Sequence, residues 1–399
     1  MQSNRTLAGV PLLVWALAVV FPAVSISQEK PAKHQYAFEP GKVDSNFTQV
    51  RPDTNYTPER GFGLDLRSKL GDLNSFFFSV ALPEGNYDVK LTFGDAKVES
   101  DTRVLSESRR LMLENVKTQA GKFETRTVTV NIRNSKLASG GQVKLKDREI
   151  KGPVSSPVLH WDDKLTLEFA GKWPAVSAIE IVKNDKAVTV YLAGDSTVTD
   201  QTRGEFRGWG QMLPRFFKPG GVAISNHAES GEATTSFIGA KRLEKILDTL
   251  KKGDYLFVQF GHNDQNQKRT IPAYKESLKR YLAEARKREA IPVLLTPMQR
   301  RNFGPDGKVR NSLGDYPEAV REVARDEKVM LIDLHAMSKE FYESLGPDKS
   351  KSAFVDNTHT NEYGGYEFAR YIAEMIQKSD LPLAKLVIED LPAKNFKGK

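Results

Sequence analysis

The 399-residue sequence contains no cysteine. Without a thiol the protein can form no disulfide, use no cysteine nucleophile, bind no metal through thiolate and carry no lipidated cysteine. A chain of this length can bury enough apolar surface to be stable without covalent cross-links. The absence therefore excludes these chemistries without arguing against a globular fold.

Beyond residue 27 the sequence also lacks any apolar run long enough to cross a bilayer. The first 27 residues differ, because Arg5 precedes an apolar stretch over 7–24 and the small residues Ser25 and Ser27 follow it. This order is typical of a secretory signal peptide. We expect residues 1–27 to be removed and the mature protein to be periplasmic or extracellular, without a stable membrane anchor. An uncleaved anchor is the alternative, which the two prolines of the apolar stretch disfavour.

Two further absences limit the class of function. The six histidines show no metal-ligand spacing such as H-E-x-x-H, so we expect no metal and no other cofactor. The lysines and arginines behind the net charge of +8 are dispersed rather than clustered. A basic exported protein suits an anionic polysaccharide, a merely solvated basic surface is the alternative, and the export signal disfavours nucleic acid.

Residues 34–185 are dominated by short stretches in which apolar and polar residues alternate. Between Tyr87 and Phe93 every second residue is apolar or aromatic, and the turn residues 83–86 precede this stretch. Alternation interrupted by turns is typical of antiparallel strands with one buried face. We therefore expect a β-sandwich of jelly-roll type over residues 34–185.

The pattern changes after Lys186, where apolar stretches alternate with helical periodicity. The expected strands are 188–193, 222–226, 254–260, 291–296 and 329–333. The expected helices are 208–217, 236–251, 272–289, 316–327, 335–345 and 361–378. Strands alternating with helices imply a parallel sheet covered on both faces. We expect an α/β domain over 186–380, followed by a C-terminal extension over 381–399.

One stretch of the second region, Val188–Asp200 (VTVYLAGDSTVTD), combines a strand pattern with chemistry. Its apolar run stops abruptly at Gly194, and Asp195 and Ser196 follow. A serine just beyond the carboxyl end of a parallel strand lies where open α/β sheets bind ligands. On this stretch alone, the polar residues serve equally well as a cap for the next helix.

Three further polar segments follow the same logic. The turn NHAESG (226–231) comes after one expected strand, GHND (261–264) comes after another, and DNTH (356–359) precedes the last helix. Because parallel strands gather their carboxyl ends at one edge of a sheet, we expect these segments to meet near Ser196.

Together the segments contain the parts that acyl transfer requires. A serine hydroxyl becomes a nucleophile when an imidazole takes its proton, and a carboxylate orients that imidazole. Ser196 can be the nucleophile, His359 the base and Asp356 its partner. The backbone amides of Ser196 and Gly231 and the side-chain amide of Asn263 can stabilise the oxyanion.

The four segments, in this order over about 188–380, resemble the four conserved blocks of the SGNH (GDSL-like) hydrolases. GDST, with GHNDQ and DNTHT, resembles the rhamnogalacturonan acetylesterase branch of that family. The resemblance implies a flavodoxin-like three-layer α/β/α fold and removal of acetyl groups from pectin-type polysaccharides. Carried over by position, it assigns Ser196, Asp356 and His359 to the catalytic triad, and Ser196, Gly231 and Asn263 to the oxyanion hole.

One departure from the family pattern concerns the glycine turn. That branch often has G-G-R-S, whereas this sequence has Glu232 in place of the arginine. The donor Gly231 is kept, so the departure puts the exact substrate in doubt rather than the triad. Arg300 and Arg301 follow an expected strand at the same edge, where they could contact a galacturonate carboxylate or remain solvated.

The N-terminal region resembles other modules more loosely. YTPERGFGLD (56–65) and the segment LPEGNYDVKLTFGD look like parts of galactose-binding or carbohydrate-binding modules that precede such esterases. Within the sandwich we expect His160 on the surface. In the GHND segment we expect His262 to be a packed structural residue rather than a catalytic one.

The leading hypothesis is an exported carbohydrate O-acetylesterase that acts on an acetylated plant-type polysaccharide or oligosaccharide. Other SGNH esterases, such as an acetylxylan esterase or a lipase-like enzyme, are alternatives, and so is a non-catalytic sugar-binding protein. The polar segment 201–205 argues against an apolar acyl channel. The complete set of Ser196, Asp356 and His359 argues against a decayed hydrolase.

Overall fold

The computed structural model describes residues 1–2, 33–38, 46–66, 75–150, 158–202 and 204–394. The expected signal peptide therefore lies outside the described residues, apart from its first two. Contacts group the chain into Met1–Pro31 and Ala32–Lys399, and the description below concerns the second unit. Among its described residues, none of the helices combines the length and the apolar character that a bilayer crossing needs.

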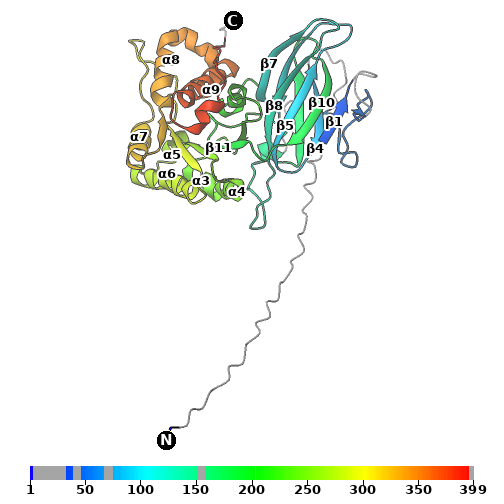
Figure 1. Cartoon of the computed structure of the whole chain (residues 1–399). Helices are drawn as coiled ribbons and strands as arrows, with labels where there is room; N and C mark the ends of the chain where they lie inside the picture. The colour runs from blue at the N-terminus through cyan, green and yellow to red at the C-terminus, as the bar shows by residue number, and fades with distance from the viewer. Residues whose placement is uncertain (3–32, 39–45, 67–74, 151–157, 203, 395–399) are drawn as a thin grey trace. The chain divides into compact units, whose positions relative to one another are not determined.

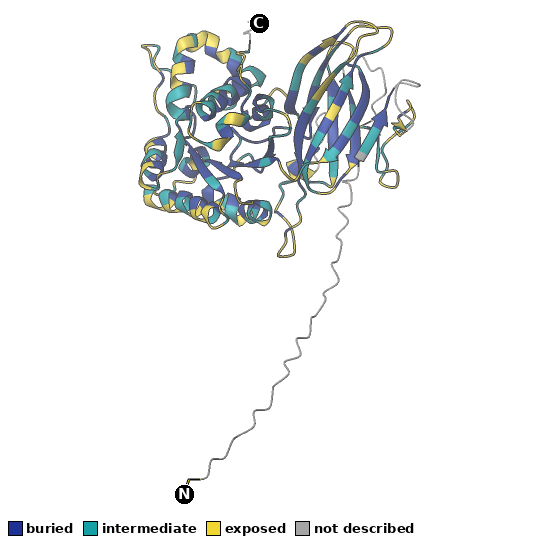
Figure 2. Ribbon diagram, viewed as in Figure 1, coloured by how far each residue is buried: buried dark blue, intermediate teal, exposed yellow. Residues whose placement is uncertain are grey.

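The second half of the chain forms one parallel sheet. Its strands are β11 (Val188–Gly194), β12 (Val222–Asn226), β13 (Tyr255–Gln259), β14 (Ile291–Leu295) and β15 (Met330–Ile332). They are arranged in the order β12-β11-β13-β14-β15, and every pairing is parallel. All five expected strands are confirmed to within one or two residues. They form because short β-branched and apolar runs suit strands that are buried on both faces, as Figure 2 shows.

Helices cover both faces of this sheet (Figure 1). Val190 and Leu192 of β11 join an apolar cluster with the helices that begin at Trp209, Leu334 and Glu362, whereas Tyr191 and Ala193 join a second cluster with those that begin at Arg242, Ile271 and Tyr316. The division follows from the two-residue period of a strand. The expected three-layer α/β/α fold, with a parallel sheet between two layers of helices, is therefore confirmed. The helices are α2 (Trp209–Met212), α3 (Thr234–Gly239), α4 (Arg242–Thr249), α5 (His262–Asn266), α6 (Ile271–Arg286), α7 (Tyr316–Asp326), α8 (Leu334–Lys349) and α9 (Glu362–Gln377), with the 3-10 turns η1 (Leu213–Phe216), η2 (Ser350–Ala353) and η3 (Pro382–Leu386).

Three helical segments differ from the sequence prediction. The helix expected over 208–217 is the short helix α2 followed by the 3-10 turn η1. The single helix expected over 236–251 is two helices, because Lys241 adopts a left-handed conformation with φ of 63° between α3 and α4. The GHND segment, expected to be a turn, forms the short helix α5. None of these differences moves a strand end, so the edge that carries the polar segments is unchanged.

The N-terminal half consists of strands in two five-stranded sheets. One sheet has the order β2-β1-β10-β5-β8 and the other β3-β4-β9-β6-β7. The strands are β1 (Lys33–Ala37), β2 (Thr48–Gln49), β3 (Phe62–Asp65), β4 (Ser75–Ala81), β5 (Gly85–Phe93), β6 (Ser100–Ser106), β7 (Arg110–Thr118), β8 (Glu124–Ile132), β9 (Lys164–Ala170) and β10 (Val176–Lys183). Neighbouring strands are antiparallel except β1 and β2, and side chains from both sheets share one apolar cluster. A β-rich region thus precedes the α/β half, and its likeness to carbohydrate-binding modules stays a prediction.

The two halves share buried contacts. Arg110 of β7 donates from Nε to Asp200 Oδ2 at 2.7 Å, and both side chains are almost fully buried. Leu105 and Leu111, from β6 and β7, belong to the same apolar cluster as Phe216 of η1. The boundary expected at residue 185 marks a change of topology, and its role as a domain boundary stays a prediction.

The C-terminal extension is anchored to the α/β half. Leu383 in η3 is fully buried, and the Tyr366 hydroxyl donates to the carbonyl of Pro392 at 3.1 Å. Lys394 Nζ forms an ion pair with Glu114 of β7 at 3.2 Å. The extension therefore contacts both halves before the described residues end at 394.

Candidate active site

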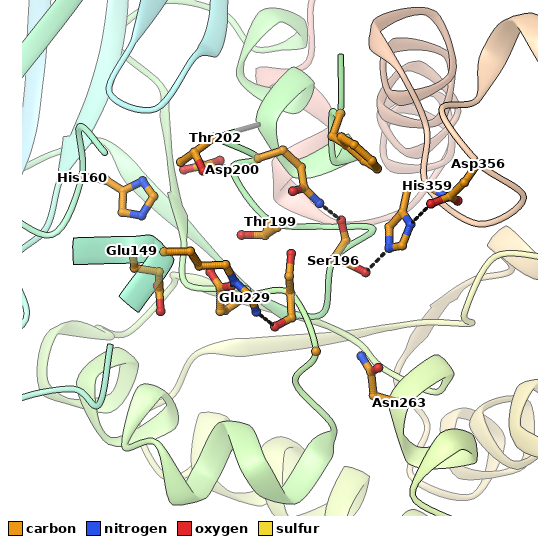
Figure 3. Close-up of a pocket in the computed structure, with 15 residues that line it drawn as sticks. Glu149, His160, Ser196, Thr199, Asp200, Thr202, Glu229, Asn263, Asp356 and His359 are labelled. Carbon is orange, nitrogen blue, oxygen red and sulfur yellow. Dashed lines mark hydrogen bonds and ion pairs between the residues drawn. The ribbon is translucent and has the colours of Figure 1, made fainter. Parts of the chain in front are cut away.

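The carboxyl ends of β11, β12 and β13 open into one cavity of about 390 Å³. β11 is the point at which the strand order reverses, and ligands of open α/β sheets bind in the crevice beside such a strand. The cavity is lined by Arg148, Glu149, His160, Ser196, Thr199, Asp200, Gln201, Thr202, Phe206, Glu229, Ser230, Gly231, Asn263, Asp356 and His359. All five residues expected to form the triad and the oxyanion hole are among them (Figure 3).

Ser196, His359 and Asp356 form a continuous hydrogen-bonded chain (Figure 3). Ser196 Oγ lies 2.8 Å from His359 Nε2, and His359 Nδ1 lies 2.7 Å from Asp356 Oδ2. Because Nδ1 faces a carboxylate, it donates, which leaves Nε2 as the acceptor for the serine hydroxyl. The arrangement can remove the proton from Ser196.

The loop before α9 fixes the carboxylate of this chain. Asp356 Oδ1 accepts hydrogen bonds from the backbone amides of Thr358 and His359, both at 2.7 Å. Burial alone would raise the pKa of Asp356, but its hydrogen bonds with His359 and Thr358 hold that pKa below the usual value. Asp356 is therefore a carboxylate at neutral pH. The ring of Phe206 packs edge-on against the His359 imidazole, with 5.7 Å between centroids.

Gly231 and Asn263 line the same cavity as Ser196, and Figure 3 shows the Asn263 side chain. Gly231 has φ of 82°, a conformation that residues with a Cβ rarely adopt, so the turn requires glycine here. Asn263 lies in the first turn of α5, and its Nδ2 donates to the carbonyl of Glu232 at 3.0 Å. An amide nitrogen has two N–H groups, so the second can serve a ligand in the cavity.

Asp195 and His262 hold the turn that presents the serine. Asp195 is fully buried and accepts from the backbone amide of Thr197 at 2.9 Å and from its hydroxyl at 2.8 Å. His262 Nδ1 lies 3.3 Å from Asp195 Oδ2, while Nε2 donates to the carbonyl of Met298 at 3.0 Å. Burial would raise the pKa of Asp195, and the partners His262 and Thr197 hold it below its usual value. Asp195 thus closes the turn after β11 and caps no helix, since the next helix, α2, begins at Trp209 with Gly208 as its N-cap. Ser196 lines the cavity.

Arg300 and Arg301 are placed outside the cavity lining. Arg300 Nη1 donates to Gln265 Oε1 at 2.9 Å, and burial lowers its pKa. Arg301 donates from Nη2 to Asn357 Oδ1 at 2.8 Å, and its backbone amide donates to the Asn357 carbonyl at 2.7 Å. The structure does not bring these arginines to the triad, and Arg301 instead supports the loop beside Asp356.

One wall of the cavity comes from the N-terminal half, from the connection between β8 and β9. Arg148, Glu149 and His160 lie on it. The expectation that His160 is on the surface is wrong, because His160 is 6% exposed. Its neighbours Leu159 and Trp161 are buried as well, and the Trp161 ring packs edge-on against His227 at 5.2 Å. The sequence motifs gave no sign of this wall, since Arg148 and His160 lie 46 and 34 residues before Gly194, where the first motif begins.

Glu229 is the buried acid of the glycine turn. Its Oε1 accepts from Arg148 Nε at 2.6 Å. Burial, together with the nearby Glu149, raises the pKa of Glu229 to about 7. Among the described residues, no group of three His, Asp or Glu side chains is arranged to hold a metal ion.

Comparison with known proteins gives consistent matches. The sequence profile described as the GDSL-like Lipase/Acylhydrolase family matches residues 192–365. The rhamnogalacturonan acetylesterase RhgT of Bacillus subtilis is 40% identical over 217 residues, which are 50% of this chain and 93% of RhgT. The uncharacterized esterase YxiM of the same organism is 25% identical over 403 residues, covering 93% of this chain and 97% of YxiM. The crystal structure of YxiM matches with a TM-score of 0.48 and 24% identity, over 87% of this chain and 98% of that one.

Proposed function

We propose that this chain, which belongs to the GDSL-like lipase/acylhydrolase family of esterases, is an exported carbohydrate O-acetylesterase with Ser196 as its nucleophile. The observation that carries the proposal is the series of two hydrogen bonds that links Ser196, His359 and Asp356. Ser196 Oγ lies 2.8 Å from His359 Nε2, and His359 Nδ1 lies 2.7 Å from Asp356 Oδ2. These three residues line a cavity that Gly231 and Asn263 line as well.

The proposed reaction has two steps. Ser196 Oγ attacks the carbonyl carbon of an acetyl ester while its proton passes to His359 Nε2. The tetrahedral intermediate collapses, the sugar oxygen leaves with the proton from Nε2, and the acetyl group stays on Oγ. A water molecule then gives a proton to Nε2 and attacks the acyl carbon. Acetic acid leaves as Oγ takes back that proton, which restores the enzyme, and the acid ionises to acetate in water.

We propose that three hydrogen-bond donors stabilise the oxyanion of the tetrahedral intermediate. They are the backbone amides of Ser196 and Gly231 and the second N–H of the Asn263 side chain. Such donors act where negative charge develops, and each typically contributes about 3–4 kcal/mol to lowering the barrier. Asp356 stabilises the imidazolium that forms on His359 in the same step.

The substrate is proposed to be an acetylated polysaccharide of the pectin type. RhgT and a relative from Emericella nidulans, 26% identical over 219 residues, are both named rhamnogalacturonan acetylesterases. The cavity offers donors and acceptors to sugar hydroxyls, because its polar lining includes Arg148, Glu149 and Asp200. A long alkyl chain would desolvate these groups without replacing their hydrogen bonds, which disfavours a lipase.

Acetate release identifies the substrate. We expect the enzyme to release more acetate from acetylated rhamnogalacturonan than from acetylated xylan, and to cleave p-nitrophenyl acetate faster than longer acyl esters. Ser196→Ala should abolish each activity, whereas Ser344→Ala, on an exposed surface of α8, should not. Mass spectrometry after acid quenching should find one acetyl group on the peptide that contains Ser196. Full activity of Ser196→Ala would overturn the proposal.

Export is the second part of the proposal, and it rests on the order of residues 1–27. Expression of the full chain in a bacterium with a periplasm, followed by N-terminal sequencing of the released protein, tests it. The proposal expects a mature chain that begins close to residue 28. A full-length chain retained in the cytoplasm would contradict it.

A further inference from the structure

We propose that Lys146 and Arg148, on the connection between β8 and β9, are positioning residues that orient and polarise the Gly231 amide of the oxyanion hole. The inference rests on the proposed function, because it assigns these cations a part in the role given to Gly231. It places a contribution to catalysis in the N-terminal half of the chain.

Both cations donate to the same carbonyl oxygen. Lys146 Nζ lies 2.6 Å from the carbonyl oxygen of Ser230, and Arg148 Nη2 donates to that oxygen as well. The carboxylates on either side of the turn hold the cations in place. Arg148 Nε donates to Glu229 Oε1 at 2.6 Å, and Lys146 Nζ pairs with Glu232 Oε1 at 2.5 Å.

The Ser230 carbonyl and the Gly231 amide are two ends of one planar peptide group. Hydrogen bonds polarise one another along a chain, so cations at the oxygen make the N–H at the other end a stronger donor. Fixing the oxygen also fixes the direction of the N–H. Direction needs such support at this position, because glycine loses more conformational freedom on folding than any other residue.

The cations are themselves held by a buried framework. Glu149 is 4% exposed, and its Oε2 accepts from the Lys146 backbone amide at 2.9 Å and pairs with Arg242. Its Oε1 accepts from Trp161 Nε1 at 3.1 Å. The short helix α1 (Asp147–Ile150) is thereby tied to both the β8–β9 connection and the α/β half. The donors to Ser230 thus come from a supported element rather than from long solvent-exposed side chains alone.

The same contacts give a reason for Glu232, the residue that departs from the family pattern. Its side chain is 3% exposed and pairs with Lys146. A buried carboxylate needs a partner, and the β8–β9 connection supplies one. Glu232, which departs from the family pattern, and Lys146 of the connection are therefore partners in one ion pair.

The test compares kinetics and transition-state binding in single and double variants. We expect Lys146→Met and Arg148→Met together to lower kcat on p-nitrophenyl acetate by about 10- to 100-fold, less than the loss of a whole oxyanion donor. KM should change by less than about twofold, since the amide acts on the transition state. Ser196 Oγ should add to the carbonyl carbon of an aryl trifluoromethyl ketone, which gives a tetrahedral adduct with an oxyanion. The affinity for this ketone should fall by a similar factor. Arg148→Lys, which keeps a donor, should recover part of kcat.

The matched control is Lys136→Met, which removes an exposed cation of the same connection that pairs with Asp163. It should leave kcat and ketone affinity unchanged. If the double variant does not fold, the two single variants carry the test with the same readouts. A wild-type kcat, or a raised KM with kcat unchanged, overturns the inference while Ser196→Ala still abolishes activity. Activity in Ser196→Ala instead overturns the proposed function itself.

Discussion

The α/β half and the N-terminal β half both contribute to one cavity, but in different ways. The α/β half provides the groups proposed to react, because parallel strands end at a common edge and bring Ser196, Gly231 and Asn263 together. The antiparallel half has no such edge. It provides Arg148 and Glu149 through a long connection that contacts the back of the glycine turn. Topology thus decides where reacting groups gather, whereas support for them can come from any segment that reaches them.

The sharpest way to test the α/β contribution is Asp356→Asn. We expect kcat to fall by about 10⁴-fold, because an amide favours the wrong imidazole tautomer and cannot stabilise the imidazolium. Steady-state kinetics on p-nitrophenyl acetate measure the loss. Asp348→Asn, on a side chain that is 93% exposed, is the control. A loss below about tenfold would mean that Asp356 is not the partner of His359.

The contact between the halves is tested by Arg110→Met. The change leaves the buried Asp200 carboxylate with Arg133 at 3.7 Å as its nearest cation. Breaking a buried ion pair in this way typically costs about 3–5 kcal/mol of unfolding free energy. Urea unfolding followed by tryptophan fluorescence provides the measurement. A change below about 1 kcal/mol would show that the two halves do not depend on this pair.

The ion pairs that join Glu362 of α9 to Arg103 of β6 and to Lys394 of the C-terminal extension should stabilise the fold in a pH-dependent way. Burial alone would raise the pKa of Glu362, but Arg103 at 2.9 Å and Lys394 at 2.5 Å lower it to about 2. A depressed pKa stabilises the folded state above about pH 4.5, and this stabilisation is lost as the pH falls towards 2. We expect Glu362→Gln to cost about 1–2 kcal/mol at pH 6, reduced for solvent screening, and much less at pH 2.5.

Unfolding free energies of the wild type and Glu362→Gln at both pH values check this expectation. Glu340→Gln, an exposed residue of α8, should show the same small difference at either pH. An equal cost for Glu362→Gln at pH 6 and pH 2.5 would contradict an electrostatic link.

The smallest effect is expected for an ion pair that lies within one half. Lys252 and Glu289 lie 2.5 Å apart, but their side chains are 77% and 65% exposed. Exposed pairs contribute about 0–1 kcal/mol. Lys252→Met should therefore change the unfolding free energy by less than about 0.5 kcal/mol in the same urea experiment. A cost as large as that of Arg110→Met would show that burial does not decide which ion pairs stabilise the fold.

Local patterns explain which features could be predicted. The parallel strands were predictable because each is an apolar run that stops at a turn, and the site segments were predictable because they follow those stops. Within the β-sandwich expected over 34–185, the strand β4 was not picked out individually, because Ser75–Ala81 (SFFFSVA) lacks strict alternation. The break between α3 and α4 depends on one residue, Lys241, adopting a left-handed conformation that periodicity does not encode.

The cavity wall was missed for a different physical reason. Lys146 and Arg148 are more than 80 residues away in sequence from the Ser230 carbonyl that they contact. Such a contact depends on how two sheets are placed, and no spacing within the sequence reports it. Arg300 and Arg301 illustrate the converse, since they follow the expected strand but are held by protein partners outside the cavity.

The shared wall has a consequence for recombination of this gene. A cut at residue 185 separates the sheets but also removes the connection that contains α1, so a chimaera carrying this α/β half behind another β module inherits a cavity open on one side. Its glycine turn would keep the buried acidic side chains of Glu229 and Glu232 without the cations that now pair with them. We therefore expect an exchange of the N-terminal half to preserve the cavity only if the new β module places cations where Lys146 and Arg148 now lie.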